Sequence, residues 1–141
     1  MRRLISILSR PAFWFVGYFC WFALLFFLSE QHGFGVKMET FPHSDKVLHA
    51  VYFAAGATVL GLGILLKKPA ISRAILLGIL LTAGLAVGVF DEWHQTYTPG
   101  REGNSLGDII ADVVGAGIGF FVACSLFRFA QRKALLQGSA P

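Results

Sequence analysis

The sequence predicts an all-α integral membrane protein with four transmembrane helices, and three observations support this. Hydrophobic residues make up 55% of the chain and charged residues only 14%, whereas soluble domains carry about 25% charged residues. Four apolar stretches reach the roughly 20 residues with which a helix crosses the hydrocarbon core. These stretches are continuous rather than alternating, which excludes the strands of a membrane barrel. Soluble globular, disordered, coiled-coil and disulfide-stabilised classes are excluded, and the 141 residues indicate one domain, 1–141.

The four spans are predicted at residues 12–29, 47–66, 74–92 and 107–127. The helical pattern of the third span continues toward Gln95. The first span is expected to remain in the mature protein, because its apolar run is too long for a signal peptide and lacks a clear A-x-A cleavage site. Cys20 and Cys124 fall inside apolar runs and are expected to be free thiols, with no spacing that suggests a metal site.

Basic residues predict the orientation of the helices. Nine of the 12 Lys and Arg residues lie on one side of the predicted spans, namely Arg2, Arg3, Arg10, Lys67, Lys68, Arg73, Arg128, Arg132 and Lys133. By the positive-inside rule this side is cytoplasmic, so both termini are expected in the cytoplasm. Residues 131–141 are expected to form a mobile basic tail. The basic residues lie at span ends and form no continuous patch, which excludes nucleic acid as a partner.

Acidic residues and histidines gather at the opposite, outer ends of the spans. The outer acids and histidines are Glu30, Glu39, Asp45, Asp91, Glu92, Glu102, Asp108, Asp112, His32, His43, His49 and His94. Loop solvation explains Glu30, Glu39 and His32, but it does not explain polar residues within helical runs. Any chemistry of this protein is therefore expected to face outward.

The first polar cluster is the segment from Ser44 to Tyr52. On a helix, Asp45, His49 and Tyr52 are spaced i, i+4, i+7 and share one face. Asp45 has a structural alternative, because Ser44 or Asp45 could cap the second helix. His49 lies at least one turn inside an apolar span, where polar groups usually face a cavity or a partner helix.

The second cluster runs from Phe90 to Arg101. Adjacent carboxylates at Asp91 and Glu92 oppose the helix dipole and abut an apolar run, so they need a compensating partner. Asp91 and Gln95 are spaced i, i+4, and the turn at residues 99–100 allows Arg101 to fold back over the site. Two interpretations stay open, a salt bridge from Arg101 that closes the loop and a pocket that binds a polar ligand.

The third cluster begins at Ser105. Ser105 and Asp108 resemble a capping box, so a structural role for Asp108 is as well supported as a functional one. Asp112 lies one turn deeper on the same face and cannot be a cap, which makes it a functional candidate. Gly115 and Gly119 continue this face at a spacing that predicts close helix packing rather than catalysis.

Together these clusters place carboxylates, a histidine and cations at one membrane depth on three helices. Such carboxylates could hold a divalent cation through oxygen ligands, although the sequence does not require a cofactor. Lys46 and Arg101 supply positive charge that suits a phosphate or carboxylate group. The candidate catalytic residues are Asp45, His49, Asp91, Glu92, Asp108 and Asp112, and the candidate ligand-binding residues are Lys46, Tyr52, Gln95 and Arg101.

These residues resemble the signature of the VanZ-like family of small bacterial membrane proteins, over residues 40–122. The matching pieces are D-K-x-x-H from Asp45, D-E-x-x-Q with P-G-R from Asp91 to Arg101, and an Asp-x-x-x-polar-x-x-Gly segment from Asp108. The family usually has Asn where this chain has Asp112. The resemblance implies a multi-pass protein of the bacterial cytoplasmic membrane and a link to resistance to the glycopeptide teicoplanin. It implies no assigned activity, and no zincin, nucleophile-elbow or Walker motif is present.

Three functions from different classes fit this pattern. The leading hypothesis is an outward-facing site that binds an anionic amphiphilic ligand of the cell envelope, such as a lipid-linked glycan or cell-wall precursor. The second is a hydrolase or transferase that acts on such a lipid, with His49 or His94 as general base, and with Asp91 orienting it or Asp91, Asp108 and Asp112 holding a metal. The third is a non-catalytic module whose buried charges hold the helices in register or recruit a partner, and a homo-oligomer is open in each case.

Overall fold

A computed structural model describes residues 7–30, 43–99 and 103–138 of the chain. It contains four long helices, α2 (Pro11–Glu30), α3 (Ser44–Lys67), α4 (Arg73–Gln95) and α5 (Leu106–Gly138). Each helix is long and apolar enough to cross a membrane, and the described residues contain no strand. The predicted all-α, multi-pass architecture is therefore confirmed, including the continuation of the third helix to Gln95.

The helix α5 is longer than predicted. The span was expected to end near residue 127 and to be followed by a mobile tail, but the helix continues to Gly138. Residues 131–138 of the expected tail are therefore helical, since the thickness of the bilayer limits a span and not a helix. The segment 130–137 (AQRKALLQ) consists of strong helix formers, and glycine first interrupts it at Gly138.

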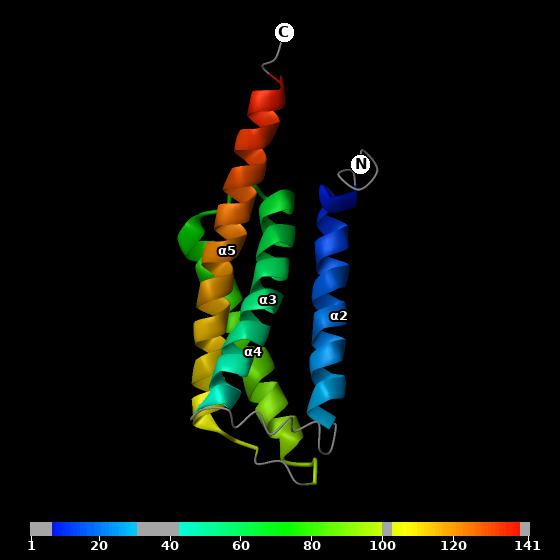
Figure 1. Ribbon diagram of the computed structural model, residues 1–141, viewed down its shortest axis with the longest axis vertical. Helices are drawn as coiled ribbons and strands as arrows, with labels where there is room; N and C mark the ends of the chain where they lie inside the picture. The colour runs from blue at the N-terminus through cyan, green and yellow to red at the C-terminus, as the bar shows by residue number, and fades with distance from the viewer. Residues whose placement is uncertain (1–6, 31–42, 100–102, 139–141) are drawn as a thin grey trace.

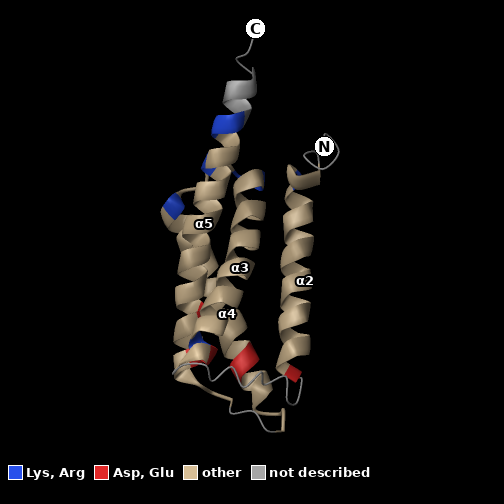
Figure 2. Cartoon of the chain, viewed as in Figure 1, with Lys and Arg blue, Asp and Glu red and all other residues tan. Residues whose placement is uncertain are grey.

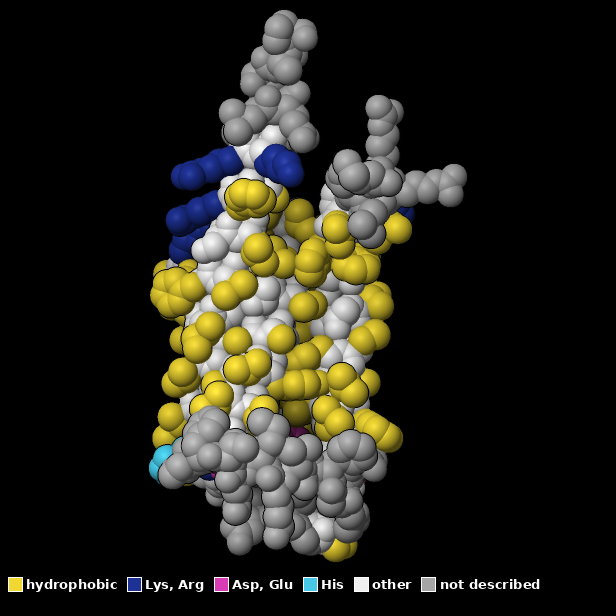
Figure 3. Space-filling view, viewed as in Figure 1, with side chains coloured by type: hydrophobic (Ala, Val, Ile, Leu, Met, Phe, Trp, Pro, Cys, Tyr) yellow, Lys and Arg dark blue, Asp and Glu magenta, His cyan; other side chains and the backbone are white. Residues whose placement is uncertain are grey.

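The helices α3, α4 and α5 form a compact bundle, and α2 stands at its side (Figure 1). The most extensive contact joins α3 to α5. By contrast, Ser29 is the one buried residue of α2. Large hydrophobic side chains cover the visible surface of the bundle (Figure 3), and many of them are exposed, including Phe19, Ile75 and Phe121. An apolar exterior of this kind suits a surface that faces lipid.

The contact between α3 and α5 is close because small residues line both sides. A Cβ atom on Gly115 would overlap the carbonyl oxygen of Ala50, and one on Gly119 would lie 2.5 Å from the carbonyl oxygen of Ala54. These glycines therefore allow the two backbones to touch, as in other small-residue helix interfaces of membranes. The packing role predicted for this glycine face is confirmed.

Charged residues are segregated along the bundle (Figure 2). Lys and Arg gather at the end where α2 begins, here called the basic end. Asp and Glu gather at the end where α4 ends and α3 and α5 begin, here called the acidic end. Lys46 is a cation at the acidic end, on the first turn of α3.

Replacing Gly115 with alanine is expected to destabilise the bundle. Its methyl group would overlap the Ala50 carbonyl oxygen, and overpacking of this kind costs about 1–3 kcal/mol. The matched control is Gly78→Ala on α4, where an added Cβ meets no atom within 4 Å. We expect thermal unfolding in detergent to show a lower Tm for Gly115→Ala and an unchanged or higher Tm for Gly78→Ala. Equal Tm values for the two variants would contradict the close α3–α5 contact.

Candidate functional site

The polar residues predicted from the sequence converge at the acidic end. We call them the polar cluster; it consists of Asp45, Lys46 and His49 on α3, Asp91, Glu92 and Gln95 on α4, and Asp108 and Asp112 on α5. Four of them, Asp91, Glu92, Gln95 and Asp112, are at most 4% exposed. Three helices thus deliver ionisable side chains to one partly enclosed region.

Lys46 links the first turns of α3 and α5. Its Nζ donates to Oδ2 of Asp45 and to Oδ1 of Asp108, each at 2.7 Å. Asp45 therefore pairs with its neighbour. The N-cap position of α3 is taken by His43, which adopts a left-handed conformation with φ 67°, and not by Ser44 or Asp45, the structural alternative that the sequence left open. The charge of Lys46 is already matched by two carboxylates.

His49 and Asp112 form a pair between α3 and α5. Nδ1 of His49 lies 2.9 Å from Oδ1 of Asp112, whose side chain is fully buried. The other carboxylate oxygen, Oδ2, has no hydrogen-bond partner, and a Cβ atom on Gly88 would lie 2.5 Å from it. Asp91, one of the alternatives for orienting a histidine, instead contacts Gln95, and Asp112 is the carboxylate that contacts His49.

Glu92 is 1% exposed and is fixed by the start of α5. The backbone N–H of Ser105 donates to its Oε2 at 2.6 Å, while Oε1 is buried without a partner. Ser105 also accepts the N–H of Asp108 through its Oγ at 3.3 Å. One of the two hydrogen bonds of the predicted capping box is therefore present, the bond from the N–H of Asp108 to Ser105. In the other, the N–H of Ser105 donates to Glu92 and not to Asp108.

Asp91 and Gln95 interact along α4, as their spacing predicts. Nε2 of Gln95 donates to Oδ2 of Asp91 at 2.7 Å, and both side chains are buried. Among the described residues, no basic side chain forms an ion pair with Asp91 or Glu92. Arg101, the partner predicted for these two acids, lies outside the described residues.

Three residues of the polar cluster are arranged so that they could hold a metal ion. His49, Glu92 and Asp108 each offer one ligand atom, and these atoms all lie within 4.8 Å of one another. The alternative metal site predicted from the sequence, Asp91, Asp108 and Asp112, shares Asp108 with this group. Helical spacing showed which residues share a face, but it could not show that α3 brings His49 to Glu92 and Asp108.

Two other candidates contact α2 instead of the polar cluster. The hydroxyl of Tyr52 donates to the carbonyl oxygen of Trp21 at 2.9 Å, and Nε1 of Trp21 donates to the carbonyl oxygen of Tyr52 at 3.0 Å. The ring centroids of His94 and Phe26 are 4.3 Å apart, and Nε2 of His94 is 3.6 Å from Oε1 of Glu30. Tyr52 and His94 thus attach α2 to the bundle.

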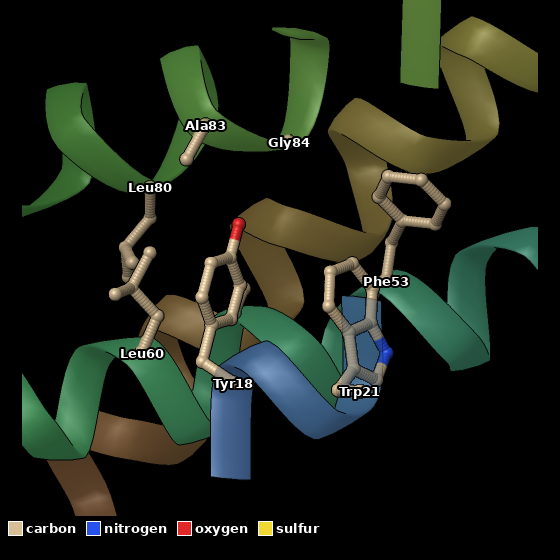
Figure 4. A pocket seen from close by; sticks show the side chains of 8 residues that line it. Tyr18, Trp21, Phe53, Leu60, Leu80, Ala83 and Gly84 are labelled. Atoms are coloured by element: carbon tan, nitrogen blue, oxygen red, sulfur yellow. The ribbon is translucent and has the colours of Figure 1, made fainter. Parts of the chain in front are cut away.

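An apolar crevice lies between α2, α3 and α4, next to the polar cluster. Its cavity volume is about 10 Å³, room for about one water molecule, and Tyr18, Trp21, Phe53, Leu80 and Ala83 contribute to its lining (Figure 4). Phe53 lies one helical turn from His49, so the crevice begins where the polar residues of α3 end. Polar and apolar surfaces therefore adjoin at this place.

Comparisons with protein-family models, with curated proteins and with solved structures found no match to this chain. The resemblance to the VanZ-like family stays a prediction from the sequence.

Lys46 is expected to stabilise the bundle mainly through Asp108. The side chain of Asp108 is 13% exposed and that of Asp45 is 60% exposed, and burial strengthens an ion pair because it reduces screening. Double-mutant cycles with Lys46→Met should give a coupling of about 1–2 kcal/mol with Asp108→Asn. The matched cycle with Asp45→Asn should give less than about 0.5 kcal/mol. The measurement is the free energy of unfolding in mixed micelles, and equal couplings would refute this assignment.

Proposed function

We propose that this chain is a protein of the bacterial cytoplasmic membrane that binds an anionic amphiphilic ligand of the cell envelope at its acidic end. Seven described Lys and Arg residues at the basic end, together with Arg2 and Arg3 in the sequence before α2, support an orientation with both termini in the cytoplasm. In this orientation the polar cluster faces outward. A lipid-linked glycan or a cell-wall precursor has the required chemistry, and the VanZ-like resemblance is in keeping with such a ligand.

The observation that carries this proposal is the position of the apolar crevice beside the polar cluster. An amphiphile needs an apolar surface for its chain and polar groups for its head at adjoining depths. The crevice lined by Phe53 and Leu80 offers the first, and the cluster around His49 and Asp108 offers the second. The crevice has no room for a chain when α2 is in this position, so binding requires α2, which buries a single residue, to move outward.

Filling the crevice should weaken binding of the chain. Ala83 lines the crevice on α4, so Ala83→Phe occupies space needed by at least two methylene groups. Losing their burial costs about 0.8 kcal/mol each, which raises Kd for a long-chain polyprenyl diphosphate about tenfold. The matched control, Ala86→Phe, changes an exposed residue of the same helix and should leave Kd unchanged. Binding is measured by native mass spectrometry of protein released from nanodiscs.

The head group gives an independent test with the same probe. Arg101→Ala is expected to weaken binding, whereas Arg128→Ala at the basic end should not. Failure of the wild-type protein to bind the diphosphate, or equal Kd values for Ala83→Phe and Ala86→Phe, would overturn the proposal.

A second candidate function is hydrolysis of such a lipid, and the pair of His49 and Asp112 at 2.9 Å favours it. A carboxylate on Nδ1 fixes the imidazole so that its other nitrogen can accept a proton. In this reaction His49 takes a proton from a water molecule while the water oxygen attacks the terminal phosphorus. The bond from that phosphorus to the bridging oxygen breaks, and the lipid monophosphate leaves with the bridging oxygen.

Turnover distinguishes this candidate from simple binding. If the protein hydrolyses the diphosphate, Asp112→Asn should lower kcat by about 10²–10⁴-fold and leave Kd within about threefold. Release of inorganic phosphate is the measurement, and Asp45→Asn, which changes an exposed neighbouring acid, is the control. Absence of phosphate release by the wild-type protein from lipid-linked diphosphates would remove the enzyme candidate and leave the binding proposal in place.

A further inference from the structure

We propose that His49, Glu92 and Asp108 form a binding site for a divalent transition-metal cation, with Asp112 as a positioning residue. Each of the helices α3, α4 and α5 supplies one ligand, and the three ligand atoms lie within 4.8 Å of one another. Bonds from a metal to imidazole and carboxylate are about 2.0–2.2 Å long. A single ion between the three side chains therefore needs only small side-chain rotations.

One buried carboxylate oxygen of the site has no partner among protein groups. Oε1 of Glu92 has no hydrogen-bond partner although its side chain is 1% exposed. A buried carboxylate oxygen without a partner costs free energy, and buried charges in proteins are usually paired or coordinate metals. Among the described residues, no basic side chain reaches Glu92. A cation at this oxygen would supply the missing partner.

The surroundings carry an excess of negative charge. The described cluster contains five carboxyl groups, those of Asp45, Asp91, Glu92, Asp108 and Asp112. Its cationic groups are Lys46, which pairs with Asp45 and Asp108, and His49 when protonated. A divalent cation binds more favourably here than an anion, because it compensates the negative charge of the buried carboxylates.

The contact of His49 with Asp112 is the arrangement expected around a metal-bound histidine. A histidine ligand usually donates its second ring N–H to a carboxylate, which fixes the ring and raises its basicity. Nδ1 of His49 is 2.9 Å from Oδ1 of the fully buried Asp112, which leaves Nε2 for the ion. Asp108 has a comparable division, since its Oδ1 accepts from Lys46 and Oδ2 remains for the ion.

The ligand set indicates the class of ion. One imidazole with two carboxylates suits Mn²⁺ or Zn²⁺, because carboxylates alone favour Mg²⁺ and Ca²⁺ and imidazole favours the transition metals. Three protein ligands leave coordination positions open, as in sites where a metal also binds water or substrate. Such an ion could bind the anionic head group next to the acidic cluster, and only this bridging role rests on the proposed function.

The test uses purified full-length protein in detergent with Mn²⁺ alone and no lipid ligand. Electron paramagnetic resonance counts the bound Mn²⁺, and pulsed measurements detect nitrogen coupled to it. We expect one Mn²⁺ for each chain with coupling to one imidazole nitrogen, and displacement by Zn²⁺, which binds such sites more tightly than Mn²⁺. An equal concentration of Mg²⁺ should not displace it.

Variants assign the ligands. His49→Gln should abolish the nitrogen coupling, and Asp108→Asn should raise Kd for Mn²⁺ at least tenfold. Asp112→Asn should retain the nitrogen coupling while raising Kd about 10–100-fold, as changes next to metal ligands do. The matched control is Glu30→Gln, which removes an exposed carboxylate of α2 outside the polar cluster and should change Kd less than threefold.

The outcomes separate this proposal from the proposed function. Absence of nitrogen coupling in the wild-type protein would overturn the cation site, even if every variant failed to fold. Equal Kd values for Asp108→Asn and Glu30→Gln would overturn it as well. Lipid diphosphate binding without Mn²⁺ binding would leave only the proposed function standing, and Mn²⁺ binding without lipid binding would leave only the cation site.

Discussion

The close contact between α3 and α5 is the constraint on which the polar cluster depends. Gly115 and Gly119 let α5 rest on the backbone of α3 at Ala50 and Ala54. His49 directly precedes Ala50, and Asp112 lies about one turn before Gly115, so the same contact brings these two side chains together at 2.9 Å. Aspartate is short and reaches histidine only because no larger side chain separates the two helices.

The number and type of helices could be predicted because they depend on local properties of the chain. An apolar run of about 20 residues must form a helix in a bilayer whatever its neighbours are. The close packing at Gly115 could be predicted for the same reason, since a small residue on the face of a membrane helix usually marks a contact. The end of α5 at Gly138 could not, because helix propensity extends the helix beyond the membrane.

The partners within the polar cluster could be predicted only along one helix. Spacing identified the pair of Asp91 and Gln95, which the structure confirms at 2.7 Å. Contacts between helices depend on the rotation of each helix about its axis, which spacing does not determine. For this reason the hydrogen bond from Ser105 to Glu92 could not be predicted. The sequence also could not show that Lys46, expected to attract an anion, is engaged by two carboxylates.

The polar cluster and the apolar crevice share α3 and α4 and differ in their third helix, which connects the two proposals. The third helix of the cluster is α5, which Gly115 and Gly119 bring onto the backbone of α3. The third helix of the crevice is α2, which buries a single residue and is joined to α3 by the reciprocal hydrogen bonds of Trp21 and Tyr52. The ligands of a metal must be held in a fixed geometry, and none of His49, Glu92 and Asp108 lies on α2. The proposed movement of α2 on lipid binding would therefore leave the three helices of the proposed cation site in place.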